Sequence, residues 1–419
     1  MSIGYRAKSG PQIKLFWYSL AWTILLTAPT LFLPVDLIWG AYPTLDKKTS
    51  LLMYLDHAHW LPINSIELLK GHTPLFLIGI HISHLWVTEI FDVLFSTCQS
   101  INFHSLFNLW LSTFVAGLFI ERRIPNHIWC SLIGGLSFGL SLHQFREIQW
   151  YTIEKTGIYW LPLFLFVLDL TIERKSKSLL PALIWMGSAM YNLYVSLLLA
   201  GCGFIYGLFY RTKTALFTLS FCILAGMTIG GLQYTIMTLG PELATEVAFQ
   251  HRAALDTVQL WPPMWNRLEM WCFISPLMVI GLWVITAKKQ HNKLDLAIAL
   301  SFFLLSFGPE LISGVRNPVY LMFSQVPGMW RMAKPEFFFT VVYLLLCLWM
   351  AKGLSILGWN SYPKRLLTAF VLIWVISCRL HPVYPKYSQY KPAKLDPNWE
   401  ERVFQGPTDD EHLLPTHQK

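Results

Sequence analysis

Residues 15–33, LFWYSLAWTILLTAPTLFL, contain no charged side chain, and a long polar segment follows at residues 35–74, VDLIWGAYPTLDKKTSLLMYLDHAHWLPINSIELLKGHTP. The apolar stretch is as long as a helix that crosses a bilayer, which needs about 20 residues. Basic residues precede it and no small-residue cleavage site follows it, so we expect a retained membrane anchor with the N-terminus inside. The polar segment is therefore expected on the outer side of the membrane.

The whole chain is strongly apolar. Its 419 residues are 54% hydrophobic and 13% charged, with a mean hydropathy of +0.45, which is typical of a multi-pass membrane protein and not of a soluble domain. The net charge of +8 comes from short Lys and Arg clusters between apolar runs, which mark membrane topology, so nucleic acid is not expected as a partner. The seven cysteines are scattered without a CxxC spacing, which favours small core residues over disulfides or zinc.

Further apolar runs predict more transmembrane helices. They lie at about residues 103–120, 128–142, 158–172, 179–210, 215–237, 268–285, 294–312, 337–354 and 366–376. Residues 179–210 are long enough for two short spans, broken near Tyr191–Asn192.

The basic clusters fall in alternate loops only if one further apolar run, residues 75–95, does not cross the membrane. That run also carries His81, His84, Glu89 and Asp92, which are costly to expose to lipid, so it is expected to be interfacial or re-entrant.

These arguments predict an all-α polytopic membrane protein with about eleven transmembrane helices. Its first outer loop, about residues 35–102, is long and contains interfacial helices. Residues 1–378 form the membrane domain, and residues 379–419, which are rich in Pro, Tyr and charge, form an extended arm at the outer face. The N-terminus is expected to be cytoplasmic and the C-terminus to lie on the outer side.

Basic residues are usually rare in the outer loops of membrane proteins, so those predicted there require an explanation. Under this topology they are Arg146, Arg252, Arg316, Arg331 and Lys334. One explanation is that they bind phosphate at the membrane surface, since arginine binds phosphate through charge-assisted, bidentate hydrogen bonds. Lipid headgroups or neighbouring carboxylates such as Glu147 are the alternative partners.

Carboxylates share this outer compartment. They are Asp46, Asp56, Glu89, Glu147 and Glu154. Transfer of a sugar from a lipid phosphate needs a carboxylate as general base and cations to stabilise the leaving phosphate. Both types are present, although spacing alone leaves their convergence open. Histidine pairs such as His57 and His59 could instead bind metal or haem, but they lack a zinc signature and interfacial histidines are the favoured interpretation.

Short motifs follow one another in a recognisable order through most of the chain. They are Thr27-Ala28-Pro29, Asp46, Trp60, Gly71-His72-Thr73-Pro74, Thr88-Glu89, Phe107-Asn108-Leu109, Glu121-Arg122-Arg123, Gly134-Gly135-Leu136-Ser137-Phe138, Trp160-Leu161-Pro162, Phe307-Gly308-Pro309, Asn317-Pro318, Val326-Pro327-Gly328 and Arg331-Met332-Ala333-Lys334-Pro335. This series resembles the GT-C superfamily of polyprenyl-phosphate-sugar-dependent membrane glycosyltransferases, and more closely a bacterial branch of multi-pass proteins within it.

The resemblance implies an inverting glycosyltransferase in the bacterial inner membrane, with its C-terminus in the periplasm. It would move a sugar from a polyprenyl-phosphate donor to an acceptor on the outer face, with membrane lipids around it. It implies Asp46 as catalytic base, Glu89 as a second catalytic acidic group, and Arg331 with Lys334 near the lipid phosphate. A divalent metal, Mg or Mn, assists some members of the superfamily, so the metal site is left unknown and no cofactor is assigned.

Two departures from the superfamily pattern keep an alternative open. Asp46 is followed by Lys47-Lys48 and lacks an acidic neighbour, and Glu336-Phe337 stand where relatives often have an arginine. The alternative is a catalytically inactive GT-C-like scaffold subunit of a larger membrane protein complex, which would contact its partners through the C-terminal arm. A transporter or flippase is a third hypothesis, but it predicts polar residues along a midplane path.

Overall fold

The computed structural model describes somewhat more than half of the chain. The described residues are 9–31, 37–39, 87–88, 90–91, 93–149, 156–175, 178–210, 220, 224, 276–288, 292–308, 310–312, 315–324, 335–380 and 387–389. This part is 86% helical, which confirms the predicted all-α class for it. Most of the expected helix at residues 215–237 and most of the expected interfacial run at residues 75–95 lie outside the described residues.

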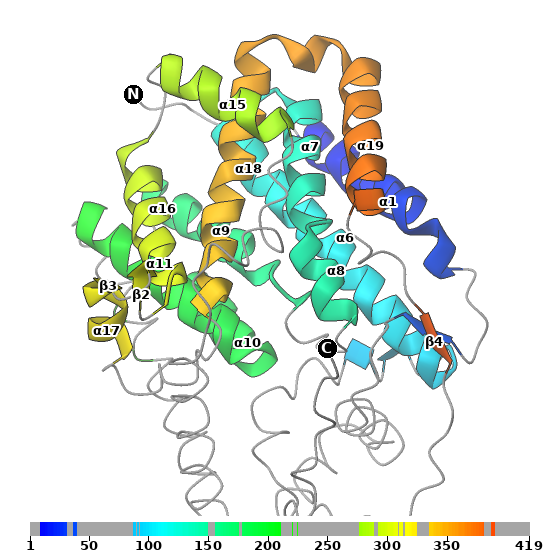
Figure 1. The fold of residues 1–419 in the computed structure, drawn as a ribbon, viewed down its shortest axis with the longest axis horizontal. Coiled ribbons are helices and arrows are strands. Elements are labelled where there is room, and N and C mark those ends of the chain that lie inside the picture. Colours follow the sequence, from blue (N-terminus) through cyan, green and yellow to red (C-terminus); the bar gives the residue numbers. More distant parts are fainter. Residues whose placement is uncertain are drawn as a thin grey trace, which may run out of the picture.

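The first group of helices is built around α6, the longest helix described. It consists of α1 (Ser9–Leu31), α6 (Thr97–Arg123) and α7 (Ile128–Gly139), and α1 crosses both of the others (Figure 1). Ser96 and Gln99 form a capping box at the start of α6, which satisfies backbone N–H groups that have no helical partner. Arg122 and Arg123 stand in its last turn, where a positive charge suits the helix dipole.

The second group of helices contains the two short helices expected from residues 179–210. It consists of α9 (Trp160–Glu173), α10 (Leu180–Tyr191) and α11 (Leu193–Tyr210). The predicted break near Tyr191–Asn192 is confirmed, because Asn192 has an extended backbone between α10 and α11. The indole N–H of Trp185 on α10 donates a 2.6 Å hydrogen bond to the carbonyl of Ser196 on α11, which fixes the pair of helices.

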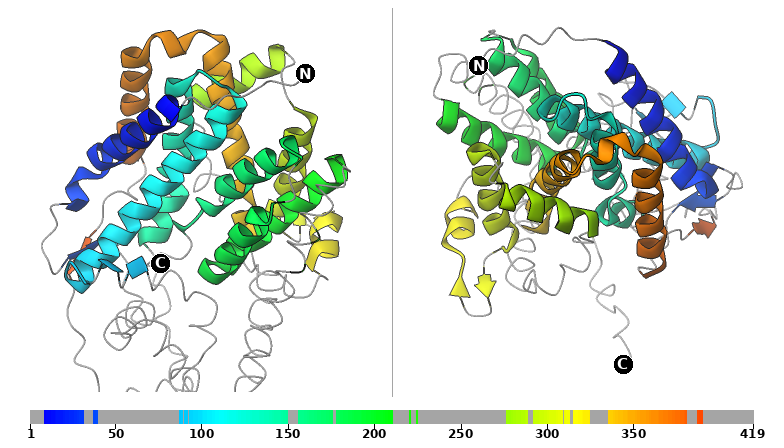
Figure 2. Two further views of the ribbon diagram at one scale, coloured as in Figure 1. Left: turned by 180° about the vertical axis from the view of Figure 1, so that it is seen from behind. Right: turned by 90° about the horizontal axis from the view of Figure 1, so that it is seen from above.

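The third group of helices packs on the opposite side of α7 from α1. It consists of α15 (Pro276–Ala287), α16 (Lys293–Ser306) and α18 (Phe339–Ile356), with α18 in contact with α7 (Figures 1 and 2). The expected helix at residues 294–312 is shorter than predicted. It ends at Ser306, and Glu310–Ile312 form strand β2, which pairs with β3 (Val315–Arg316). The apolar run therefore continued into a strand that hydropathy alone did not distinguish from a helix.

Further elements connect or flank these groups. They are α8 (Leu142–Gln149), α17 (Pro318–Ser324), α19 (Pro363–Leu380) and the 3-10 helices η4 (Pro335–Phe338) and η5 (Trp359–Ser361). Strand β1 (Leu37–Trp39), just after α1, pairs antiparallel with β4 (Tyr387–Gln389) near the C-terminus. This pair lies at the N-terminal end of α6 (Figure 1), so the first predicted outer segment and the C-terminal arm meet there.

Two helices in the described part are long and apolar enough to cross a membrane by length and composition. They are Gln99–Arg123 within α6, and α18. Several of the others, such as α7 with 12 residues and α9 with 14, are shorter than the length of about 20 residues that a straight crossing needs.

Glycines allow close contact between helices. A Cβ atom added at Gly135 of α7 would lie 2.4 Å from the carbonyl oxygen of Thr113 on α6, and one added at Gly281 of α15 would lie 2.3 Å from the Cα of Met350 on α18. Both distances are to backbone atoms, which cannot move without shifting a helix. Small residues at such positions let helix backbones approach, as is common between transmembrane helices.

We therefore expect Gly135→Ala to separate α6 from α7 and to destabilise the protein by about 1–3 kcal/mol, the usual range for an overpacked site. Gly10→Ala is the matched control, because a Cβ atom at Gly10 has no neighbour within 4 Å. Unfolding of both variants in mixed micelles with increasing SDS measures the difference. Equal stability of the two variants would contradict the assigned helix contact.

Candidate functional site

The structure describes two of the eight candidate site side chains. Asp46, Glu89, Arg252, Arg331 and Lys334 lie outside the described residues, and the side chain of Arg146, on α8, does as well. Glu147 is buried on α8, whereas Arg316 is exposed on β3. The catalytic assignments of Asp46 and Glu89 therefore stay predictions.

A buried network of polar side chains lies near the N-terminal end of α6. It is called here the His104 network and consists of Thr88, His104, Asn108, Thr156 and Tyr191, each at most 1% exposed. The His104 ring nitrogens lie 2.7 Å from the Thr88 hydroxyl on one side and 2.7 Å from the Tyr191 hydroxyl on the other. The Asn108 amide donates to the Tyr191 and Thr156 hydroxyls, each at 2.8 Å.

The local sequence explains this arrangement. His104 and Asn108 are four residues apart and so lie on one face of α6, while Tyr191 is the last residue of α10 and Thr156 precedes α9. A Cβ atom at Gly157 would lie 2.2 Å from the Tyr191 ring, so glycine leaves the space that this ring occupies. The network therefore fixes α6, α10 and the segment before α9 against one another.

Gln144 of α8 extends this polar layer. Its amide nitrogen donates to the Ser112 hydroxyl at 3.2 Å and to the Thr156 carbonyl at 3.0 Å, which sets the orientation of the amide. Its amide oxygen is buried and has no hydrogen-bond partner in the part of the chain that the structure describes. A buried acceptor without a donor is unusual in native proteins.

Glu147 lies next to this layer, together with a histidine. The Nδ1 atom of His143 is 3.7 Å from a carboxylate oxygen of Glu147, and the two residues are 4% and 1% exposed. The His143 ring makes an edge contact with Phe337 of η4, with centroids 5.4 Å apart. Helix α8 lies in the outer segment predicted between the apolar runs 128–142 and 158–172, and η4 directly follows the one predicted at residues 313–334, so this contact brings the two segments together.

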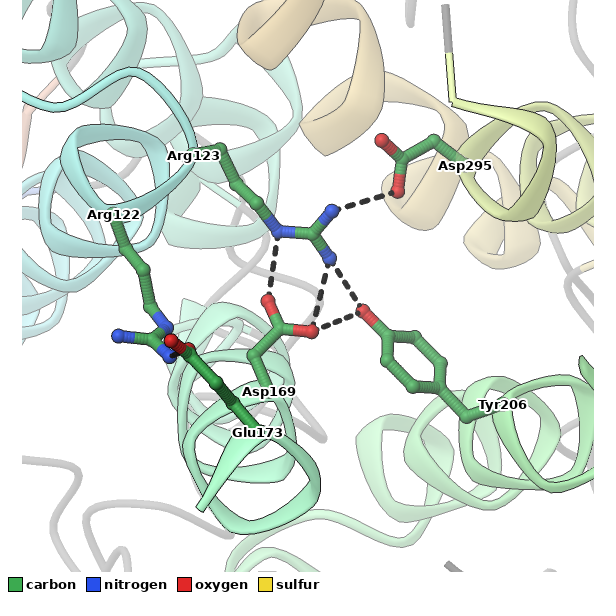
Figure 3. A network of polar contacts seen from close by, with 6 residues as sticks. All are labelled: Arg122, Arg123, Asp169, Glu173, Tyr206 and Asp295. Carbon is green, nitrogen blue, oxygen red and sulfur yellow. Dashed lines mark hydrogen bonds and ion pairs between the residues drawn. The ribbon is translucent and has the colours of Figure 1, made fainter. Parts of the chain in front are cut away.

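A second polar network lies at the other end of α6 and is shown in Figure 3. In this Arg123 network, the guanidinium makes two hydrogen bonds to the Asp169 carboxylate, at 2.7 and 3.1 Å, and one to the Tyr206 hydroxyl, at 2.7 Å. Tyr206 also donates to Asp169 at 3.0 Å. Asp295 of α16 accepts from the guanidinium on its remaining side, at 3.4 Å.

Burial makes these ion pairs depend on one another. The side chains of Arg123, Asp169 and Asp295 are 18%, 11% and 6% exposed. A buried charge is tolerated only when it is paired and hydrogen-bonded, so one arginine here compensates two carboxylates. The neighbouring pair of Arg122 and Glu173 is nearer the surface, since Glu173 is 53% exposed.

The two networks have different chemical capacities. The hydrogen bonds described for the Arg123 guanidinium are all made to protein side chains, so this network is suited to holding helices together. The His104 network is neutral and borders the predicted outer segments, so it is the better candidate for a role at a site. In the described part of the chain, no group of three or more His, Cys, Asp or Glu side chains is placed to hold a metal ion.

Sequence reasoning did not single out His104 or the carboxylates that pair with Arg123, although it quoted Arg123 within a motif and placed a helix break near Tyr191–Asn192. His104 and Tyr191 stand inside apolar runs, where only their polarity marked them, and Asp169 and Asp295 stand near the ends of such runs. Polar residues inside an apolar run were the available signal, because they are costly in lipid and therefore usually face other helices.

Comparisons of the chain with protein-family models, with curated proteins and with solved structures found no match.

Tyr191→Phe tests the His104 network. Loss of the hydroxyl removes its hydrogen bonds to the buried His104 ring and Asn108 amide. We therefore expect the free energy of unfolding to fall by about 1–3 kcal/mol. Tyr362→Phe is the matched control, because Tyr362 is 56% exposed. Unfolding in SDS mixed micelles compares them, and a neutral Tyr191→Phe variant would show that the hydroxyl does not carry the network.

Arg123→Met tests the second network. It leaves Asp169 and Asp295 without their shared cation, so we expect a loss of about 3–5 kcal/mol. Arg122→Met, whose partner Glu173 is exposed, should cost about 0–1 kcal/mol. The same unfolding measurement distinguishes them, and equal losses would mean that Arg123 is no more important than a surface ion pair.

Proposed function

We propose that this chain is a multi-pass inner-membrane protein of GT-C-like architecture that transfers a sugar from a polyprenyl phosphate to an acceptor on the outer face. The observation that carries the proposal is the contact between His143 of α8 and Phe337 of η4. Arg146 and Glu147 lie on the same helix as His143, and Lys334 directly precedes η4. The contact thus supports the convergence of two outer segments that the proposed reaction requires.

The distribution of polarity supports a membrane location. Large apolar side chains are exposed on the outer faces of the helices, for example Trp17 on α1, Trp283 on α15, Leu300 on α16 and Leu372 on α19. The most deeply buried positions, in contrast, include the polar groups of the His104 network. Large exposed tryptophan and leucine side chains around buried polar groups suit contact with lipid, where polar side chains face other helices.

The two networks support the proposed topology of about eleven crossings. The Arg123 network joins the ends of α6, α9 and α11 to the start of α16, and the basic clusters assign all four ends to the inner side. The His104 network and the pairing of β1 with β4 join segments that are all assigned to the outer side. A topology that separated any of these partners would place them about 30 Å apart across the bilayer.

The proposed reaction uses residues of the outer face. Asp46 removes the proton of an acceptor hydroxyl, whose oxygen attacks the anomeric carbon of the sugar as the bond from that carbon to the lipid phosphate breaks. Arg331 and Lys334 stabilise the charge on the leaving phosphate, and Glu89 acts as the second acidic group. Asp46 and Glu89 lie outside the described residues, so we assign no step to a metal ion.

Asp46→Asn tests the proposal, since the amide cannot act as a base. We expect transfer from a panel of radiolabelled polyprenyl-phosphate sugars to fall by about 100-fold or more in membranes that contain this variant. Asp56→Asn, in the same polar segment, is the control that should retain transfer.

Two results would contradict the proposal. Transfer by Asp46→Asn at the wild-type rate would exclude Asp46 as the base. Absence of transfer by the folded wild-type protein with every donor, together with its co-purification in a defined membrane complex, would favour the scaffold subunit instead.

A further inference from the structure

The His104 network connects the helices to the first predicted outer loop, about residues 35–102. Thr88 belongs to that loop, whereas Tyr191 is on α10 and Asn108 is on α6. His104 stands between these two parts of the chain. Its Nδ1 atom lies 2.7 Å from the Thr88 hydroxyl, and its Nε2 atom lies 2.7 Å from the Tyr191 hydroxyl. The network therefore ties the loop to the helices as well as joining helices to one another.

The helices fix the orientation of the His104 ring. The Tyr191 hydroxyl, which contacts Nε2, also exchanges hydrogen bonds with the Asn108 side chain, at 2.8 and 3.0 Å. A neutral imidazole has one donor and one acceptor nitrogen, and a hydroxyl serves as either, so one ring satisfies Tyr191 and Thr88 at the same time. With Nε2 held by Tyr191, the opposite nitrogen is directed at the loop.

A second contact docks the same part of the loop on α6. Phe91 follows Thr88 by three residues, and the described residues around them are helical, so the two side chains lie on one face of a helical turn. The Phe91 ring centroid lies 6.2 Å from that of Phe103 and 6.1 Å from that of Phe107, both on α6. A polar contact and an aromatic contact therefore hold this turn against the same helix.

Glu89 is joined to this turn by the chain itself, because it directly follows Thr88. Its own placement lies outside the described residues, whereas its neighbours are described. Thr88 is 1% exposed and Ile90 is 64% exposed, so the residues on either side of Glu89 face the interior and the surface. A catalytic group must be held within about 0.5 Å of its productive position, and hydrogen bonds from supporting residues provide this precision.

The loop is also attached to α6 where it begins. Strand β1 contacts α6 and pairs with β4, toward the same N-terminal end of α6 that carries His104 (Figure 1). Asp46 lies in the chain between β1 and Thr88, so the stretch that carries Asp46 is tied to this end of the helix on both sides. Of the two attachments, the one at Thr88 directly adjoins an acidic residue of the proposed reaction.

From these contacts we propose that His104 is a positioning residue, which holds Glu89 at the outer face through its hydrogen bond to Thr88. The inference rests on the proposed function, in which Glu89 is the second acidic group. In this role His104 and Thr88 act through Glu89 and not on the substrate. The network thus has a role in the reaction that the joining of helices alone does not require.

Thr88→Val tests this role, because valine keeps the shape of threonine and removes the hydroxyl. Transfer is measured with the full-length protein in nanodiscs and with the radiolabelled polyprenyl-phosphate sugar that the wild type uses. We expect kcat to fall about tenfold or more and KM for the donor to stay within about twofold, since a misplaced group weakens binding of the transition state more than binding of the substrate. Thr88→Ser, which keeps the hydroxyl, should restore most of the rate.

A double-mutant cycle separates positioning from a general loss of structure. Glu89→Gln removes the acidic group, so adding Thr88→Val to it should lower kcat by less than about twofold. Thr171→Val on α9 is the matched control, because Thr171 is also buried and its hydroxyl also donates a hydrogen bond, to the Val167 carbonyl at 2.8 Å. Each rate is divided by the amount of folded protein, which is measured by unfolding in SDS, and Thr88→Ala is used if Thr88→Val fails to fold.

Four results would overturn the inference alone. They are a wild-type kcat in Thr88→Val, an equal loss in Thr171→Val, an undiminished effect of Thr88→Val in the Glu89→Gln background, and wild-type transfer by Glu89→Gln. Absence of transfer by the folded wild-type protein with every donor would instead reject the proposed function itself, so the two failures are distinguishable.

Discussion

The guanidinium of Arg123 is the interaction on which the arrangement of the helices depends. It stands at the end of α6 and contacts Asp169 of α9, Tyr206 of α11 and Asp295 of α16, so one cation connects all three groups of helices. Burial makes the connection obligatory, because moving any one partner would leave a charge in an apolar interior without compensation. Apolar contacts alone would allow these helices to slide past one another, and the directed hydrogen bonds of arginine restrict them to one register.

The opposite end of the bundle is held by neutral groups. His104, Asn108 and Tyr191 share hydrogen bonds in a fully buried layer, where the penalty for an unpaired group again fixes the geometry. Between the two polar layers, α6 and α7 approach through Gly135, and α15 and α18 approach through Gly281. The described part of the protein thus combines a charged and a neutral polar network with close packing of helix backbones, and many apolar side chains are exposed on its helices.

This architecture gives the two ends different functional capacity. The charged end satisfies its own groups, whereas the neutral end retains a buried amide oxygen at Gln144 and borders the contact between α8 and Phe337. The proposed glycosyl transfer is assigned to the neutral end for this reason.

The sequence by itself determined the class of the fold and the places of most helices, because hydrophobic runs are a local property. It located the break between α10 and α11 at Asn192, yet it extended α16 into the strand that begins at Glu310. It also named Glu147, but it did not indicate the pairing of Arg123 with Asp295, 172 residues apart, or of His104 with Tyr191, 87 residues apart. Only the tertiary structure decided these pairs, because spacing along the chain carries no information about which helix faces meet once burial forces polar groups to find partners.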